Sequence, residues 1–171
     1  MTSYEELFSV GEDFESFVRH GLPAQISAVR DIQRKLTEAD AISPATQQRM
    51  HAVEGAFHLL VAGEMWCPDC QINVTALDYL QRAQPNIDVA IISKGRAENE
   101  LKARLGLERI SIPLVLVLDN RFQVIGRFVE RPQQVVAGGD AVKPDYRAGK
   151  YLESTVQDIL TIMSLQTSPL G

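Results

Sequence analysis

The chain has 171 residues, which is enough for one globular domain with an extension and a sizeable buried core. Hydrophobic residues make up 45% of it and charged residues 23%, the composition of an ordinary soluble protein. Its 22 acidic residues outnumber the 17 basic ones, and the resulting net charge of −5 repels nucleic acid and anionic lipid, so we expect neither as a partner.

The first residues, Met1 to Glu6, are acidic and lack the basic start and apolar stretch of a signal peptide. No apolar run approaches the roughly 20 residues that cross a bilayer. We therefore expect a cytoplasmic protein with no membrane partner.

Residues 1–54 are predicted to be entirely helical. One apolar face runs from Leu7 to Val18 and predicts a first helix, and a second face runs from Ile26 to Leu36. Ser43 and Pro44 supply the N-cap and the first helical position of a third helix.

The pattern changes from residue 55 onward. Residues 57–62 form a short apolar run, as expected of a strand that is covered on both faces, and Pro68 begins a helix that runs to about residue 85. The remaining predicted elements are a strand at 87–93, a charged helix at 97–105, strands at 113–119 and 122–129, a loop at 130–144 and a helix at 146–165. Residues 94–96 are interpreted as a basic turn, and the tail at 166–171 is expected to be frayed.

The two cysteines, Cys67 and Cys70, lie three positions apart where the first strand meets the helix that Pro68 begins. So short a loop gains little from a structural disulfide. At the N-cap, unpaired backbone N–H groups and the positive end of the helix dipole stabilise a thiolate at Cys67. Cys70 follows one turn later on the same side, where it can attack a mixed disulfide formed at Cys67. The pair therefore predicts dithiol–disulfide chemistry.

Two other interpretations of the cysteine pair remain open. A tetrahedral zinc site needs about four ligands, but the three histidines, His20, His51 and His58, are not at ligand spacing. A metal shared across a dimer interface would meet that need. The pair could also be inert and buried. We expect no bound metal within one chain.

The residues around the cysteines have predicted roles of their own. Trp66 would shield the sulfur and offer an apolar contact to an incoming partner, and Pro68 suits the first helical turn. Asp69 adds negative charge beside Cys67, which raises the pKa of that thiol and makes the dithiol a better reductant. Asp69 could instead serve only as an acid that favours the start of the helix.

A Trp-Cys-x-x-Cys segment after an apolar strand, with Ile112-Pro113 opening a later strand, resembles the thioredoxin superfamily. The tetrad Cys-Pro-Asp-Cys resembles that of small cytosolic thioredoxin-related proteins, and the segments 62–67 and 146–151 resemble a bacterial thioredoxin-like family. The resemblance covers about residues 57–165. It implies an α/β thioredoxin-like fold without its first strand: a central mixed sheet of about four strands, flanked by helices, with an all-helical N-terminal extension. The predicted domains are thus the extension, 1–54, and a thioredoxin-like domain, 55–171.

The resemblance also implies roles for single residues. Cys67 matches the attacking cysteine and Cys70 the resolving one, while Pro113 matches a proline that the superfamily holds in the cis form facing them. The backbone of Ile112 would then pair with an extended substrate segment. Together with these two, we expect the substrate-binding residues to be Trp66, Pro68 and Asp69.

One position departs from the family. Thioredoxins bury an aspartate in the strand before the motif, as the group that accepts the proton of the resolving cysteine, and this chain has Val61 there. Glu64 is the nearest carboxylate, and we predict it as the substitute base. The alternative is that Glu64 is a solvated residue at the end of a strand.

The resemblance implies a thiol–disulfide oxidoreductase, and Asp69 favours a disulfide reductase acting on protein or small-molecule disulfides. No cofactor is expected, because the dithiol is the redox group, but an external thiol reductant or a thioredoxin reductase-like enzyme must reset it. A binding module without turnover is the alternative. The N-terminal helices either pack on the sheet or form a homodimer interface or a wall of a substrate groove, and the loop at 130–144 could flank the cysteines.

Overall fold

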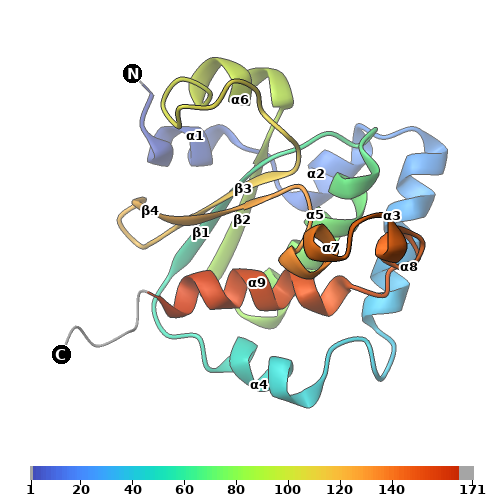
Figure 1. Ribbon diagram of the computed structural model, residues 1–171. Helices are drawn as coiled ribbons and strands as arrows, with labels where there is room; N and C mark the ends of the chain where they lie inside the picture. The colour runs from blue at the N-terminus through green and yellow to red at the C-terminus, as the bar shows by residue number, and fades with distance from the viewer. Residues whose placement is uncertain (1, 166–171) are drawn as a thin grey trace.

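Four strands form one mixed sheet in the computed structural model, which describes residues 2–165 (Figure 1). Their spatial order is β2-β1-β3-β4, with β1 parallel to β2 and the other neighbours antiparallel. The two central strands are apolar and buried along almost their whole length, as strands covered on both faces must be, whereas β4 is partly exposed. The strands are β1 (Phe57–Ala62), β2 (Ile87–Ile92), β3 (Leu114–Leu118) and β4 (Val124–Val129). The predicted α/β fold class is confirmed.

Helices cover both faces of the sheet. The long helix α5 (Pro68–Ala83) connects β1 to β2 and packs against the C-terminal helix α9 (Leu152–Ser164). Figure 1 shows these two helices on one side of the sheet, and α1 (Tyr4–Val10) and α6 (Lys94–Glu100) on the other. Among residues 2–165, no helix has both the length and the apolar character needed to cross a membrane.

The single first helix predicted up to Val18 is wrong. The structure has two helices there, α1 and α2 (Phe14–Arg19), and Glu12 between them forms an antiparallel bridge to Ile91 on the outer edge of β2. Its backbone N–H and C=O bond to Ile91 at 2.8 and 2.9 Å. Gly11 permits the close approach, because a Cβ there would lie 2.8 Å from the Cβ of Ala90.

The other two N-terminal helices are confirmed. They are α3 (Pro23–Leu36) and α4 (Pro44–His51), and Ser43 caps α4 as expected. Helix α3 packs along α5, and α4 packs against α5 and α9. Buried side chains of this region belong to the same hydrophobic core as the sheet. The domain boundary at residue 54 stays a prediction.

Three predictions in the second half of the chain need correction. Ser93 caps α6, so the predicted basic turn at 94–96 is the first helical turn and the helix ends earlier than expected. The predicted loop at 130–144 is mostly helical. The predicted last helix is interrupted near Gly149, which has a φ of +81°. The elements there are α7 (Gln133–Gly138), the 3-10 helix η1 (Gly139–Val142), α8 (Lys143–Arg147) and α9. The tail expected to be frayed lies outside the described residues.

Candidate functional site

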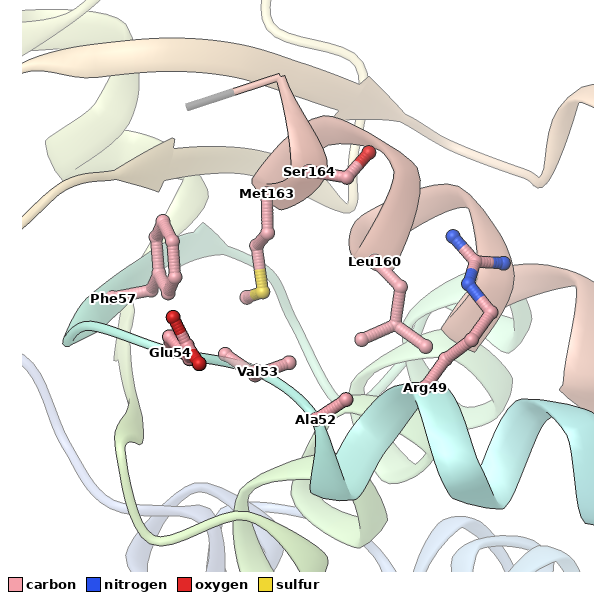
Figure 2. A pocket seen from close by; sticks show the side chains of 8 residues that line it. All are labelled: Arg49, Ala52, Val53, Glu54, Phe57, Leu160, Met163 and Ser164. Carbon is pink, nitrogen blue, oxygen red and sulfur yellow. The ribbon is translucent and has the colours of Figure 1, made fainter. Parts of the chain in front are cut away.

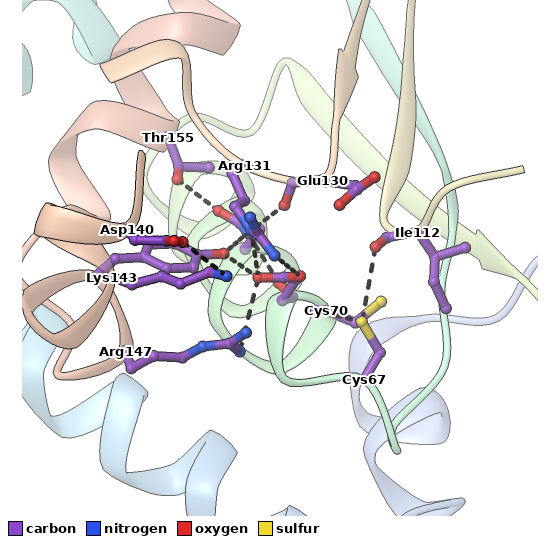
Figure 3. A network of polar contacts seen from close by, with 12 residues as sticks. Cys67, Cys70, Ile112, Glu130, Arg131, Asp140, Lys143, Arg147 and Thr155 are labelled. Atoms are coloured by element: carbon purple, nitrogen blue, oxygen red, sulfur yellow. Dashed lines mark hydrogen bonds and ion pairs between the residues drawn. The ribbon is translucent and has the colours of Figure 1, made fainter. Parts of the chain in front are cut away.

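The two cysteines lie at the C-terminal end of β1, where α5 begins. Cys67 is the N-cap residue of α5, and its Sγ accepts a hydrogen bond from the backbone N–H of Cys70 at 3.4 Å. Its thiol also faces the carbonyl oxygen of Ile112 at 3.7 Å, as Figure 3 shows. Cys67 is 6% exposed and Cys70 is fully buried. A Cβ at Gly63 would lie 3.4 Å from the Cys70 Sγ, so this glycine leaves room for the inner sulfur.

The pKa values of the two thiols are shifted in opposite directions. A hydrogen bond from the Cys70 thiol, together with the Cys70 backbone N–H, lowers the pKa of Cys67 to about 7, although burial and the charge of Asp69 oppose the change. The pKa of Cys70 is raised, first by the hydrogen bond it gives to Cys67 and then by burial. At neutral pH the outer sulfur is therefore the nucleophile and the inner one stays a thiol.

This difference predicts a pH profile for alkylation of the intact protein. The rate of reaction with iodoacetamide should rise with pH to a plateau, with its midpoint near pH 7, because only the Cys67 thiolate reacts. Mass spectrometry of the modified peptide measures it. A Cys67→Ser variant should stay unmodified throughout that range. A midpoint near 8.5, the value of an ordinary cysteine, would contradict the prediction.

The peptide bond between Ile112 and Pro113 is cis, as expected, and leads into β3 opposite the cysteines. The backbone of Pro113 is also bonded to the segment after β4, because its carbonyl oxygen accepts a hydrogen bond from the backbone N–H of Glu130 at 2.8 Å. The outer sulfur and the segment proposed to receive substrate thus face each other across the site.

An exposed tryptophan and the N-terminal helices flank the cysteines. Trp66 is 59% exposed, and Pro68 is exposed beside it. The segment joining α2 to α3 lies next to this surface, because a Cβ at Gly21 would lie 2.6 Å from the Met65 side chain. Leu22 in that segment is also largely exposed. The N-terminal helices therefore border the surface around Cys67.

Glu64 has a partner other than the sulfurs. Its carboxylate Oε2 accepts a hydrogen bond from the backbone N–H of Lys94 at 2.8 Å, at the start of α6. Only a hydrogen bond from its backbone acts on Cys70, where it lowers the pKa of the thiol. The role of Glu64 as a base stays a prediction, and this geometry does not favour it.

Asp69 points into the protein. It is 7% exposed, and its Oδ1 accepts hydrogen bonds from the Tyr146 hydroxyl at 2.7 Å and from Nε of Arg131 at 3.2 Å. Arg147 adds an ion pair at 3.7 Å. Asp69 lies in the first turn of α5, as the interpretation as an acid that favours the helix requires. Its burial does not favour a surface contact with substrate, and that role stays a prediction. We call Asp69, Arg131, Tyr146 and Arg147 the Asp69 cluster.

Asn73 connects the Asp69 cluster to the rest of the site. It is fully buried one turn after Asp69, and its Nδ2 lies 2.9 Å from the Tyr146 hydroxyl and 3.0 Å from the Glu130 carbonyl oxygen. Its Oδ1 accepts a hydrogen bond from Thr155 on α9 at 2.7 Å. Glu130 adopts a left-handed φ of 65°, held by Asn73 on one side and by Pro113 on the other.

The sequence pattern predicts no role for Asn73 or Arg131, and Tyr146 enters the prediction only through the family resemblance. The available signal was the polar pair Asp69 and Asn73, spaced i and i+4, although Thr75 and Asp78 are also polar and buried in the same helix. The Asn73 amide also donates to the Asp69 carbonyl oxygen at 2.9 Å, but the other partners named above lie at least 57 positions away along the chain, so spacing gives no hint of them.

The histidines considered as metal ligands lie elsewhere. His20 pairs with Glu12 at 2.8 Å, and His58 stacks on Phe122 with ring centroids 4.2 Å apart. His51 is the exposed last residue of α4. Within residues 2–165, no group of three or more His, Cys, Asp or Glu side chains is arranged to hold a metal ion.

A separate pocket of about 240 Å³ lies between α4 and α9, near the start of β1 and therefore at the end of that strand away from the cysteines (Figure 2). Its walls are mainly apolar, with two charged side chains among them. The lining residues are Arg49, Ala52, Val53, Glu54, Phe57, Leu160, Met163 and Ser164. It is not part of the site around the two cysteines.

Comparison with known proteins places this geometry in context. A family model described as "Thioredoxin" matches residues 11–143, which include both cysteines and Pro113. The crystal structure of PA1234, a protein of unknown function from Pseudomonas aeruginosa, is 55% identical, with a TM-score of 0.94 over 97% of this chain and 99% of that one. An HIV epitope-scaffold is also 55% identical, with a TM-score of 0.92 over 95% and 98% of the two chains. None of the curated proteins matches this chain.

Proposed function

This chain belongs to the thioredoxin family, and from that membership we propose that it is a thiol–disulfide oxidoreductase that reduces disulfides of proteins or small molecules. The observation that carries the proposal is the arrangement of the two sulfurs. Cys67 caps α5 and its pKa is lowered to about 7, and Cys70, one turn later, is a fully buried thiol. A nucleophile and a resolving group thus occupy one helical turn.

The reaction uses the two sulfurs in sequence. The Cys67 thiolate attacks one sulfur of the substrate disulfide, and the other substrate sulfur leaves as a thiolate that takes up a proton. Cys70 then loses its proton and attacks the Cys67 sulfur, which closes the Cys67–Cys70 disulfide and releases the second substrate thiolate. Two electrons pass from the protein to the substrate, and an external thiol reductant or a thioredoxin reductase-like enzyme returns them.

The direction of transfer follows from how strongly the thiolate is stabilised. A Cys67 pKa of about 7 is close to that of reducing Cys-x-x-Cys motifs, whereas strongly oxidising ones lie near 3.5. The negative charge of Asp69 works against the thiolate, which also favours a reductant. For substrate contacts we propose the exposed faces of Trp66 and Pro68 and the backbone beside Pro113.

A redox titration tests the proposal. The purified protein is equilibrated with dithiothreitol or glutathione mixtures of defined potential, its remaining thiols are alkylated, and the mass of the peptide carrying Cys67 and Cys70 is followed. We expect one two-electron transition near about −270 mV, as for thioredoxin, whereas a value near about −120 mV would indicate an oxidant.

Absence of an intramolecular disulfide at every potential would reject the proposed activity. Metal analysis of the same sample would then distinguish a metal centre shared across a dimer from a binding module. A Cys70→Ser variant, which has only one of the two sulfurs and cannot form the intramolecular disulfide, is the negative control for the titration.

A further inference from the structure

Asp69 lies between the two cysteines in the sequence, yet its carboxylate accepts hydrogen bonds from Arg131 and Tyr146 of the Asp69 cluster. The charged groups that face it come from two other elements: Arg131 follows β4, and Arg147 belongs to α8. The Tyr146 hydroxyl stays protonated, because burial and its hydrogen bond to Asp69 both raise its pKa. Arg131 is the closer cation, and it contacts both carboxylate oxygens.

The cluster adjoins the helix terminus that stabilises the thiolate. Asp69 occupies the first turn of α5, directly after Pro68, so its charge lies at the same end of the helix as the Cys67 sulfur. Burial of the carboxylate keeps water from screening that charge, and only its cationic partners oppose it. Three further charged residues lie near Arg131: Glu130 precedes it in the chain, and Asp140 and Lys143, which form an ion pair at 3.5 Å, line a pocket together with it.

We propose that Asp69 and Arg131 are positioning residues that act on the dithiol in opposite directions: the carboxylate disfavours the Cys67 thiolate, and the guanidinium restores it by neutralising the carboxylate. This proposal rests on the function proposed above and explains how the same site is tuned toward reduction. The charge of Asp69 does act against ionisation of both cysteines, which agrees with the placement. A role in packing alone would give the two residues effects of the same sign.

Two substitutions test whether Asp69 and Arg131 affect the reactivity of Cys67 in opposite directions. In Asp69→Asn the amide oxygen can still accept the hydrogen bond from Tyr146, but the charge is gone. At about pH 6, below the Cys67 pKa of about 7, the rate of alkylation of Cys67 by iodoacetamide should rise about threefold in this variant and fall about threefold in Arg131→Gln. The double variant should return close to the rate of the unmodified chain.

The chain offers matched controls. Asp31 and Arg34 form an ion pair on α3 in which both side chains are more than half exposed. Asp31→Asn and Arg34→Gln repeat the same two chemical changes there, and both should leave the rate of Cys67 unchanged. Arg131→Lys keeps the positive charge without the two-pronged contact, and it should retain most of the original rate.

Rates that move in the same direction in Asp69→Asn and Arg131→Gln, or that stay unchanged in both, would overturn the proposal. If Asp69→Asn does not fold, the comparison of Arg131→Gln with Arg131→Lys decides, and equal rates in these two variants would overturn it. Alkylation requires no turnover and no disulfide. Failure of the redox titration would therefore reject the proposed function alone, and failure of the opposed rates would reject this inference alone.

Discussion

Replacing Cys67 by serine is expected to reduce disulfide reduction to the uncatalysed background, because no other described sulfur is both acidic and close to the surface. Replacing Cys70 by serine has a different expected result. The Cys67 thiolate can still attack, but nothing in the chain resolves the mixed disulfide that forms. The chain should then accumulate as a covalent adduct with its substrate.

Both outcomes are measured with one substrate, a small aromatic disulfide whose released thiol absorbs light. Each protein is reduced and then freed of reductant before the substrate is added, because dithiothreitol would reduce the substrate directly and cleave a mixed disulfide at Cys67. The intact chain should then release two equivalents of thiol and close the Cys67–Cys70 disulfide. Cys70→Ser should release at most one equivalent of thiol quickly and gain the mass of the other half of the substrate, and Cys67→Ser should do neither. Fast release of thiol by Cys67→Ser would show that the chemistry lies elsewhere.

Replacing Asn73 by leucine is expected to lower the free energy of unfolding by about 3 kcal/mol, roughly a 150-fold change in the folding equilibrium. Leucine has a similar size but no polar atoms. The change leaves the Glu130 carbonyl and the Thr155 hydroxyl without the partner they have in the structure, and Thr155 is only 1% exposed. Each such loss costs about 1–3 kcal/mol.

Urea unfolding followed by circular dichroism measures this change from the shift in the transition midpoint. Asn99→Leu is the matched control, because Asn99 is exposed on α6 and the same substitution there should change stability by no more than about 0.5 kcal/mol. A loss below about 1 kcal/mol for Asn73→Leu would mean that its hydrogen bonds contribute little to the stability of the fold.

Local patterns were sufficient for the elements that carry the sulfurs. The apolar run of β1 and of β3 predicts a buried central strand whatever packs on it, because both faces must be covered. Pro68 after Cys67 predicts where α5 begins, since proline suits the first helical position. These two features alone place Cys67 at the N-cap of α5 and Cys70 one helical turn later.

Periodicity was insufficient at the N-terminus. Leu7 and Phe14 are seven positions apart, so they would share one face of a single helix, and both are buried although they belong to two helices. The chain leaves the helix between them because Glu12 bonds to the open edge of β2. That edge belongs to a strand far away in the sequence, and no pattern within residues 1–20 reports it.

The identity of the polar partners was decided by the tertiary structure alone. Asp69 and Asn73 are visible in the sequence as polar residues one turn apart on α5, and a buried polar group must find a hydrogen-bonding partner. Which residues serve depends on how α8, α9 and the end of β4 pack around the first turn of α5. The same holds for Glu64, because only the structure shows that its carboxylate accepts a hydrogen bond from the Lys94 N–H at the start of α6. Sequence alone therefore predicted where the two sulfurs lie, because local patterns set the strand and the helix that carry them, and only packing decided which groups surround them.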